Sequence, residues 1–164
     1  MSSRGITIDI QNLAPEGVIT PLTPAPAPGP KILFADDAVD LREAIKIFLL
    51  EEGYQCQAAG DGAEAIWLFG EFQPDLVILD LHMPVVSGSD ACAIIRQRSD
   101  VPIIIFTATD NAADSNGLFD KGATGIVLKS SGMGNLIEQV AFHLAKKNEP
   151  VVNLDRNVIA MATA

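Results

Sequence analysis

Positive charge is scarce in this sequence. Lysine and arginine total 11 residues against 21 aspartate and glutamate residues, which leaves a net charge of −10. A nucleic-acid-binding protein needs a basic surface that neutralises phosphates. The charge balance therefore argues against DNA binding by this chain.

Cysteines and long apolar runs are also scarce. The only cysteines are Cys56 and Cys92, which we interpret as reduced packing residues of a cytosolic protein. No apolar run reaches the roughly 18 residues of a membrane span, and the N-terminus lacks the charged and apolar segments of a secretory signal. Together these absences predict a cytoplasmic protein with no membrane partner.

The 164 residues are enough for one core of ordinary size. We expect residues 1–30 to form an N-terminal arm that ends in a proline-rich, semi-rigid spacer. Within the arm, residues 5–10 alternate as a short strand would, and they either dock on a sheet edge or partner or belong to a disordered tail. Residues 31–147 form the predicted domain. The apolar C-terminal tail, 148–164, either covers exposed surface, pairs with a second subunit or is the stub of a longer chain.

Strand and helix patterns alternate through the predicted domain. Apolar runs of the buried-strand type occupy residues 31–35, 54–58, 75–80, 102–106 and 124–128. Helical spacing follows these runs, with Asp61 as the expected cap of the second helix and Ser87 or Ser89 as that of the third. The fourth helix, near 111–121, contains a glycine and two asparagines, so we expect it to be short, irregular or mobile. The pattern predicts an α/β fold in which helices cover both faces of a parallel sheet.

Three carboxylates stand at the ends of two of these strands. Asp36 and Asp37 follow the first strand, and Asp80 ends the third. The carboxyl ends of neighbouring parallel strands open into one crevice, so the acids should meet there. Clustered anions repel one another unless a cation joins them, and hard oxygen ligands suit Mg²⁺ or Mn²⁺. The sequence therefore predicts a divalent-metal site.

Thr107 and Lys129 directly follow two further predicted strands, which brings a hydroxyl and an ammonium to the same sheet edge. Such a set suits phosphoryl chemistry, because a carboxylate can act as nucleophile while a metal neutralises the transferring group. Lysine supplies a point charge for phosphate, and the hydroxyl can hydrogen-bond a phosphoryl oxygen.

The order and spacing of these motifs resemble the receiver domain of two-component response regulators. The resemblance covers residues 31–147 and rests on Phe34-Ala35-Asp36-Asp37, Leu79-Asp80-Leu81-His82-Met83-Pro84, Thr107-Ala108 and Lys129. It implies a flavodoxin-like fold, a five-stranded parallel sheet with strand order 2-1-3-4-5.

The resemblance also implies a role for each matching residue. Asp80 would accept a phosphoryl group from a phosphohistidine on a sensor histidine kinase or phosphotransfer protein. Asp37 would bind Mg²⁺ (or Mn²⁺) directly, Asp36 through water, and the backbone carbonyl of His82 would complete the metal site. The catalytic set would be Asp80 with two residues that contact the phosphoryl group, the switch hydroxyl Thr107 and the pairing lysine Lys129.

Two positions depart from the family pattern. Ser130 stands where proline usually follows the lysine, and Ile126 replaces the aromatic residue of the fifth strand. A switch that couples Thr107 to an aromatic ring therefore cannot work in its usual form. We also expect His143 and the single tryptophan, Trp67, to lie at the surface, Trp67 being partly packed.

Three functions remain open at this point. The leading hypothesis is a phosphoacceptor that signals through a downstream protein, with no chemistry beyond self-phosphorylation and autodephosphorylation on Asp80. The alternative is a receiver-like interaction or dimerisation module with altered switching, for which a homodimer is possible. A multiple-turnover phosphatase of the dehalogenase type is disfavoured because His82 stands where that class needs a second acid.

Overall fold

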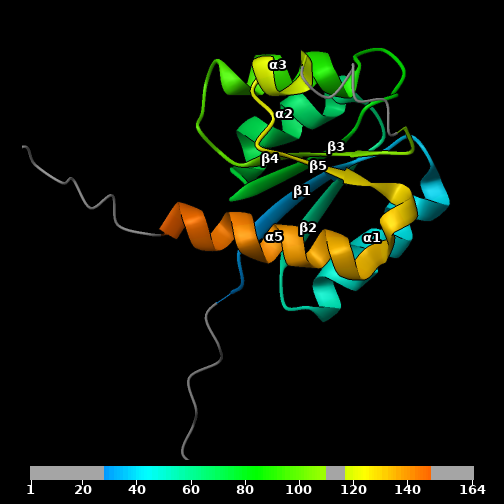
Figure 1. The fold of residues 1–164 in the computed structure, drawn as a ribbon, viewed down its shortest axis with the longest axis vertical. Coiled ribbons are helices and arrows are strands. Elements are labelled where there is room, and N and C mark those ends of the chain that lie inside the picture. Colours follow the sequence, from blue (N-terminus) through cyan, green and yellow to red (C-terminus); the bar gives the residue numbers. More distant parts are fainter. Residues whose placement is uncertain (1–27, 110–116, 149–164) are drawn as a thin grey trace, which may run out of the picture.

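The computed structural model describes residues 28–109 and 117–148, which form a sheet with helices on both faces (Figure 1). All strand pairs are parallel, and the strand order is β2-β1-β3-β4-β5. The strands are β1 (Lys31–Ala35), β2 (Gln55–Ala59), β3 (Leu76–Asp80), β4 (Ile103–Thr107) and β5 (Gly125–Leu128). The predicted fold class and strand order are therefore confirmed.

The predicted strand bounds are wrong by about one residue in most of the strands, for local reasons. Strand β2 begins at Gln55 because the Tyr54 amide still donates to Leu49 O at the end of the preceding helix, at 3.0 Å. Strand β4 begins after Pro102, which has no amide hydrogen to give to a ladder. It continues one residue further than expected, to Thr107.

Helices α1 (Val39–Glu51) and α5 (Gly132–Asn148) cover one face of the sheet, and α2 (Gly62–Phe72) and α3 (Gly88–Arg96) cover the other (Figure 1). Both predicted caps are present. Asp61 accepts from Glu64 N at 2.8 Å, and Ser87, rather than Ser89, accepts from Asp90 N at 3.2 Å. Of the weak fourth helix, residues 117–120 are helical and 110–116 lie outside the described residues.

The two faces of the sheet carry separate apolar cores, because side chains alternate along each strand. Central strands β3 and β4 are buried at every residue, as expected for parallel strands covered on both sides. The core under α1 and α5 contains Phe34, Ile78 and Phe106, and the core under α2 and α3 contains Leu33, Leu79 and Ile105. Strands β1 and β3 are hydrogen-bonded neighbours in a register that pairs Ala35 with Leu79. Asp36 and Asp80 are the next residue on each strand, so they leave the sheet side by side.

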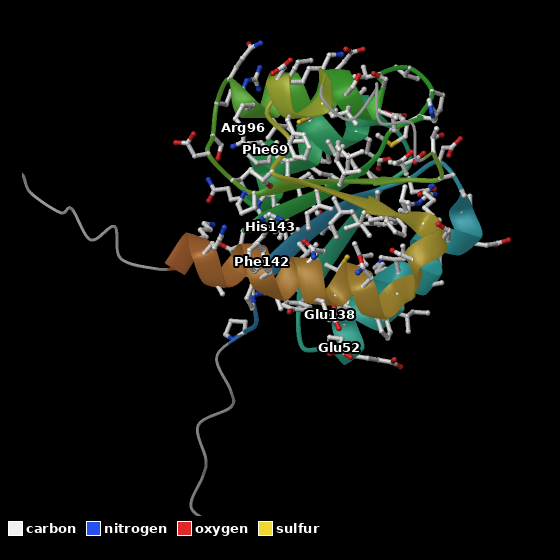
Figure 2. The ribbon with its side chains drawn as sticks, viewed as in Figure 1. Glu52, Phe69, Arg96, Glu138, Phe142 and His143 are labelled. Carbon is white, nitrogen blue, oxygen red and sulfur yellow. The ribbon has the colours of Figure 1, made fainter. Side chains whose placement is uncertain are left out.

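Several expectations concern single side chains. Cys56 and Cys92 are free thiols, and Cys92 is buried. Trp67 is exposed on α2, which agrees with its predicted position. His143, on α5 (Figure 2), is half-buried rather than a surface residue. Its ring lies against Gly125 of β5, where a Cβ would come within 2.7 Å of Nε2.

Other expectations concern segments outside the described residues. These are most of the N-terminal arm (1–30) and most of the tail (148–164). Within the described part of the chain, none of the helices has the length and hydropathy needed to cross a bilayer.

Candidate functional site

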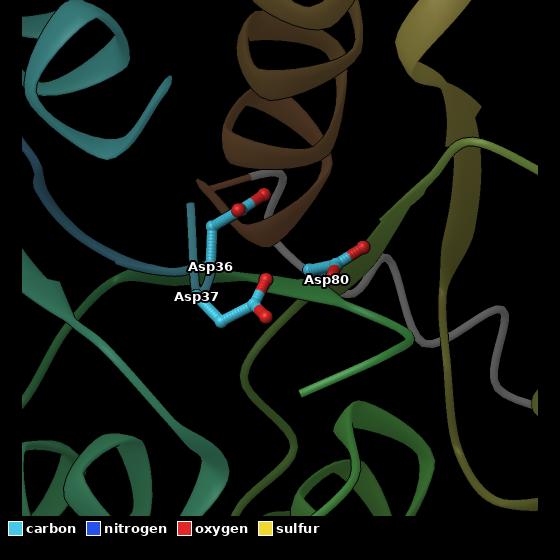
Figure 3. A group of neighbouring side chains, drawn as sticks. All are labelled: Asp36, Asp37 and Asp80. Atoms are coloured by element: carbon cyan, nitrogen blue, oxygen red, sulfur yellow. The ribbon is translucent and has the colours of Figure 1, made fainter. Parts of the chain in front are cut away.

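The acids Asp36, Asp37 and Asp80 meet at the carboxyl ends of β1 and β3 (Figure 3). One carboxylate oxygen from each lies within 4.8 Å of the others. Asp36 is fully buried and Asp80 is 4% exposed, whereas Asp37 is open to solvent. Negative charges this close and this poorly solvated require a cation nearby.

Asp36 is fixed by contacts to its backbone and its side chain. Its amide donates to Ala59 O on β2 at 3.1 Å, and its carbonyl accepts from Arg42 Nη1 at 2.6 Å. Its Oδ1 accepts from Ala38 N at 2.9 Å, which closes a local turn of the kind that aspartate favours. The carboxylate is thereby oriented by both its own loop and the neighbouring elements.

Lys129 supplies the cation that the acids require. Its Nζ lies 2.7 Å from Asp36 Oδ2 and 3.1 Å from Asp80 Oδ1. Burial lowers the pKa of Lys129, but its close ion pairs with Asp36 and Asp80 outweigh that effect and raise the pKa above its usual value. The ammonium therefore stays charged and bridges two of the three carboxylates.

The pKa of Asp80 is raised above its usual value. Burial is the largest cause, the ion pair with Lys129 opposes it, and the charges of Asp36 and Asp37 add to it. The ionised form of Asp80 thus depends on nearby positive charge. A carboxylate with few favourable contacts of its own is suited to attack an electrophile or to bind a metal.

Thr107 and the loop after Lys129 also have defined partners. Thr107 is buried, and its Oγ1 accepts from Thr109 N at 3.2 Å. Residues Lys129–Ser131 form one 3₁₀ turn, the element η2. Ser131 Oγ donates to Leu128 O at 2.7 Å, so the hydroxyl that holds this turn comes from the residue after Ser130, which occupies the proline position of the family pattern.

The loop between β3 and α3 approaches the acids closely. A Cβ at Gly88 would overlap the carbonyl oxygen of Asp80, so only glycine fits there. Val85 has φ of 65° and is 84% exposed. The Val86 amide donates back to Pro84 O at 2.7 Å, so the bulky Val85 is the centre of a strained, γ-turn-like bend.

The structure brings the predicted acids and the lysine together: Lys129 contacts Asp36 and Asp80, and Asp37 lies in the same carboxylate group. The side chain of His82 is exposed and outside that group; the prediction for His82 concerned its backbone carbonyl only. Sequence reasoning did not single out Arg42 or Gly88. The Ser-Gly-Ser run at 87–89 was a usable signal for Gly88, whereas the contact of Arg42 with a backbone carbonyl leaves no signal in the sequence.

The residues present fit a divalent metal ion. Asp36 Oδ2 is buried and, among the described residues, accepts no hydrogen bond of good geometry, although Lys129 Nζ is 2.7 Å away. This oxygen keeps a lone pair for a cation, and the two other carboxylates offer further hard oxygens within 4.8 Å. Such a donor set suits Mg²⁺ or Mn²⁺. Asp36, Asp37 and Asp80 are the side chains that would hold the ion.

Comparison with known proteins finds matches to one family. The family model of the response regulator receiver domain matches residues 32–141. The DNA-binding response regulator MtrA of Mycolicibacterium smegmatis is 36% identical over 119 residues, which cover 73% of this chain and 52% of that protein. The probable transcriptional regulator ycf27 of Guillardia theta is 37% identical over 119 residues, or 73% of this chain and 47% of that protein. The chain thus spans about half the length of these relatives.

Solved structures show the same arrangement of elements. The receiver domain of the Francisella response regulator 1452 has a TM-score of 0.69 at 28% identity, covering 73% of this chain and 99% of that one. The chemotaxis protein CheY4 of Vibrio cholerae has a TM-score of 0.67 at 26% identity, covering 70% and 98%.

Proposed function

The chain belongs to the receiver-domain family of two-component response regulators, and from that membership we propose that it is a Mg²⁺-dependent phosphoacceptor, phosphorylated on Asp80. The phosphodonor would be a sensor histidine kinase or a phosphotransfer protein. The observation that carries the proposal is the contact of one lysine with two of three clustered carboxylates, Lys129 with Asp36 and Asp80. We propose residues 31–147 as the receiver unit.

In the proposed reaction, an Asp80 carboxylate oxygen attacks the phosphorus of a phosphohistidine. A P–O bond forms as the P–N bond breaks, and the nitrogen lone pair returns to the imidazole. The pair with Lys129 supports the reactive, ionised form of Asp80 against the effect of burial. When bound, Mg²⁺ would supply charge neutralisation for the acids and the transferring group.

After transfer, the phosphoryl group would need new polar contacts. Lys129 Nζ lies 3.1 Å from Asp80 Oδ1 and can donate to a phosphoryl oxygen there. The Thr107 hydroxyl accepts from Thr109 N, and a hydroxyl that accepts one hydrogen bond can still donate its own proton. We assign His82 a backbone role only, as a carbonyl ligand of the metal, because its side chain is exposed.

We propose that the signal leaves through contact with a downstream protein in the cytoplasm. Relatives of this chain are named as DNA-binding regulators, so DNA binding within a longer protein is compatible with family membership. The net charge of −10 supports protein contact as the output of this chain itself.

A second candidate, an interaction or dimerisation module with altered switching, has one specific observation in its favour. Ile126 on β5 is partly buried against the core under α2 and α3. An aliphatic side chain at this position has no aromatic ring that could change its orientation when Thr107 moves. Under this reading phosphorylation would leave the oligomeric state unchanged.

The test is incorporation of phosphate from a small phosphodonor such as acetyl phosphate, with and without Mg²⁺, by wild type and Asp80→Asn. Asp100→Asn is the matched control, because Asp100 is an exposed acid outside the carboxylate cluster. We expect Mg²⁺-dependent labelling of wild type and Asp100→Asn only. Labelling of Asp80→Asn would refute the assignment of Asp80. Sedimentation of both states then separates the two candidates, because only a switch changes its assembly or its partner affinity.

A further inference from the structure

Arg42, in the first turns of α1, contacts the loop that carries the two acids after β1. Its Nη1 donates to the carbonyl oxygen of Asp36 at 2.6 Å. That oxygen belongs to the peptide group that joins Asp36 to Asp37. The orientation of this peptide plane sets the direction in which the two carboxylates leave the backbone.

The guanidinium is itself held against a second loop. A Cβ at Gly60 would lie 3.4 Å from Arg42 Nη1 and 3.6 Å from its Cζ, so the arginine packs over a glycine in the turn between β2 and α2. Gly60 N donates to Glu64 Oε2 at 2.7 Å, which fixes that turn to α2. Arg42 is half-buried and thereby links the loop after β1 to the loop after β2.

We propose that Arg42 is a positioning residue for the metal site, and that it acts by fixing the peptide between Asp36 and Asp37. The inference rests on the proposed function. Within the described residues the close partner of the guanidinium is a backbone carbonyl, not one of the clustered carboxylates. Arg42 therefore orients ligands without neutralising them.

The position and the charge of Arg42 act on metal affinity in opposite directions. A cation near three carboxylates repels an incoming cation, so loss of the charge alone would tighten Mg²⁺ binding. Loss of the contact would release the peptide and misalign the acids, which weakens binding. Groups that orient metal ligands typically change metal affinity by 10- to 100-fold when removed. The sign of the change in affinity therefore separates the two effects.

The experiment is calorimetric titration of the full chain with MgCl₂ for wild type, Arg42→Ala and Arg42→Lys. Arg98→Ala removes the same charge from an exposed position on the chain and is the matched control. We expect the dissociation constant to rise about tenfold in Arg42→Ala. Arg42→Lys should recover part of the loss because it keeps a donor, and Arg98→Ala should match wild type. Urea unfolding of each variant confirms that the titrated protein is folded.

Three results would count against the inference. If Arg42→Ala binds Mg²⁺ as Arg98→Ala does, or more tightly, Arg42 does not position the acids and the proposed function still stands. If Arg42→Ala loses only stability and keeps its Mg²⁺ affinity, its role is structural and the inference is wrong. If wild type itself does not bind Mg²⁺, the proposed function fails and the inference fails with it.

Discussion

Replacement of Lys129 by methionine tests whether its ammonium is the counter-ion of the acids. The Nζ lies 2.7 Å from Asp36 Oδ2 and 3.1 Å from Asp80 Oδ1. At these separations Coulomb's law gives about 5–6 kcal/mol for each pair at an effective dielectric constant near 20, before desolvation is subtracted. Removal of one partner from a buried ion pair typically costs about 3–5 kcal/mol. The lysine side chain is 23% exposed, so we expect about 3 kcal/mol.

The same loss should be small when Mg²⁺ is present. A ligand that binds only the folded state stabilises it by about 2.7 kcal/mol at 100 times its dissociation constant. Lys129→Met removes the group that competes with a metal for Asp36 Oδ2, so this variant should bind Mg²⁺ more tightly than wild type. If the variant binds the ion roughly 30-fold more tightly, the difference in unfolding free energy falls from about 3 to about 1 kcal/mol in saturating Mg²⁺, and this is the result that we expect.

Urea unfolding in EDTA and in MgCl₂, for wild type and Lys129→Met, measures both quantities. Lys121→Met is the control, because its ion pair with Asp90 is exposed and should contribute less than about 1 kcal/mol in either buffer. An equal loss for Lys129→Met in both buffers would show that the ammonium and the metal do not share the acids. That result would refute the reasoning.

Three further predictions follow from single contacts. Val85→Gly should raise the unfolding free energy by about 1 kcal/mol, because it relieves a β-branched residue at φ of 65°; a loss of stability in urea unfolding would contradict the strain. Gly88→Ala should cost about 3 kcal/mol, since the added Cβ overlaps the Asp80 carbonyl; a urea midpoint like that of wild type would show that the loop yields. Asp80→Asn should be more stable than wild type without metal at pH 7, by on the order of 1 kcal/mol. Burial raises the pKa of Asp80 in the folded state, so ionisation of Asp80 opposes folding. The wild-type protein is therefore most stable below the pKa that Asp80 has in the unfolded chain, and it loses this part of its stability as the pH rises through the pKa of the folded state. The advantage of the asparagine variant should disappear towards pH 3, and an advantage that persists there would contradict the assigned cause.

The meeting of the acids could be predicted from sequence because it requires only that the two parallel strands that carry them are neighbours. Asp36 and Asp80 directly follow or end apolar runs, and parallel neighbours bring such ends to one edge. The register that pairs Ala35 with Leu79 agrees with this expectation. Caps such as Asp61 were predictable for a similar reason, because a cap bonds to an amide three residues away.

The position of His143 was not predictable from its helix. The helical pattern places it beside the apolar stripe of α5, but its burial depends on the absence of a side chain at Gly125 on β5. The first residues of β2 and β4 also differ from the predicted ones. The Tyr54 amide donates to Leu49 O instead of to a strand, and Pro102 has no amide hydrogen to donate, so each strand begins one residue later.

The sequence by itself determined the parallel sheet and the group of residues at its carboxyl edge, since these follow from local patterns and parallel topology. The strand order was predicted from the resemblance of the motifs to a receiver domain. The tertiary structure alone decided how that group is connected. Lys129 bridges two acids, Arg42 binds the peptide between Asp36 and Asp37, and Gly88 closes over Asp80. These contacts join residues on different elements. They depend on how far a side chain extends and how closely two backbone segments approach each other, and the spacing of residues along the chain does not encode these distances.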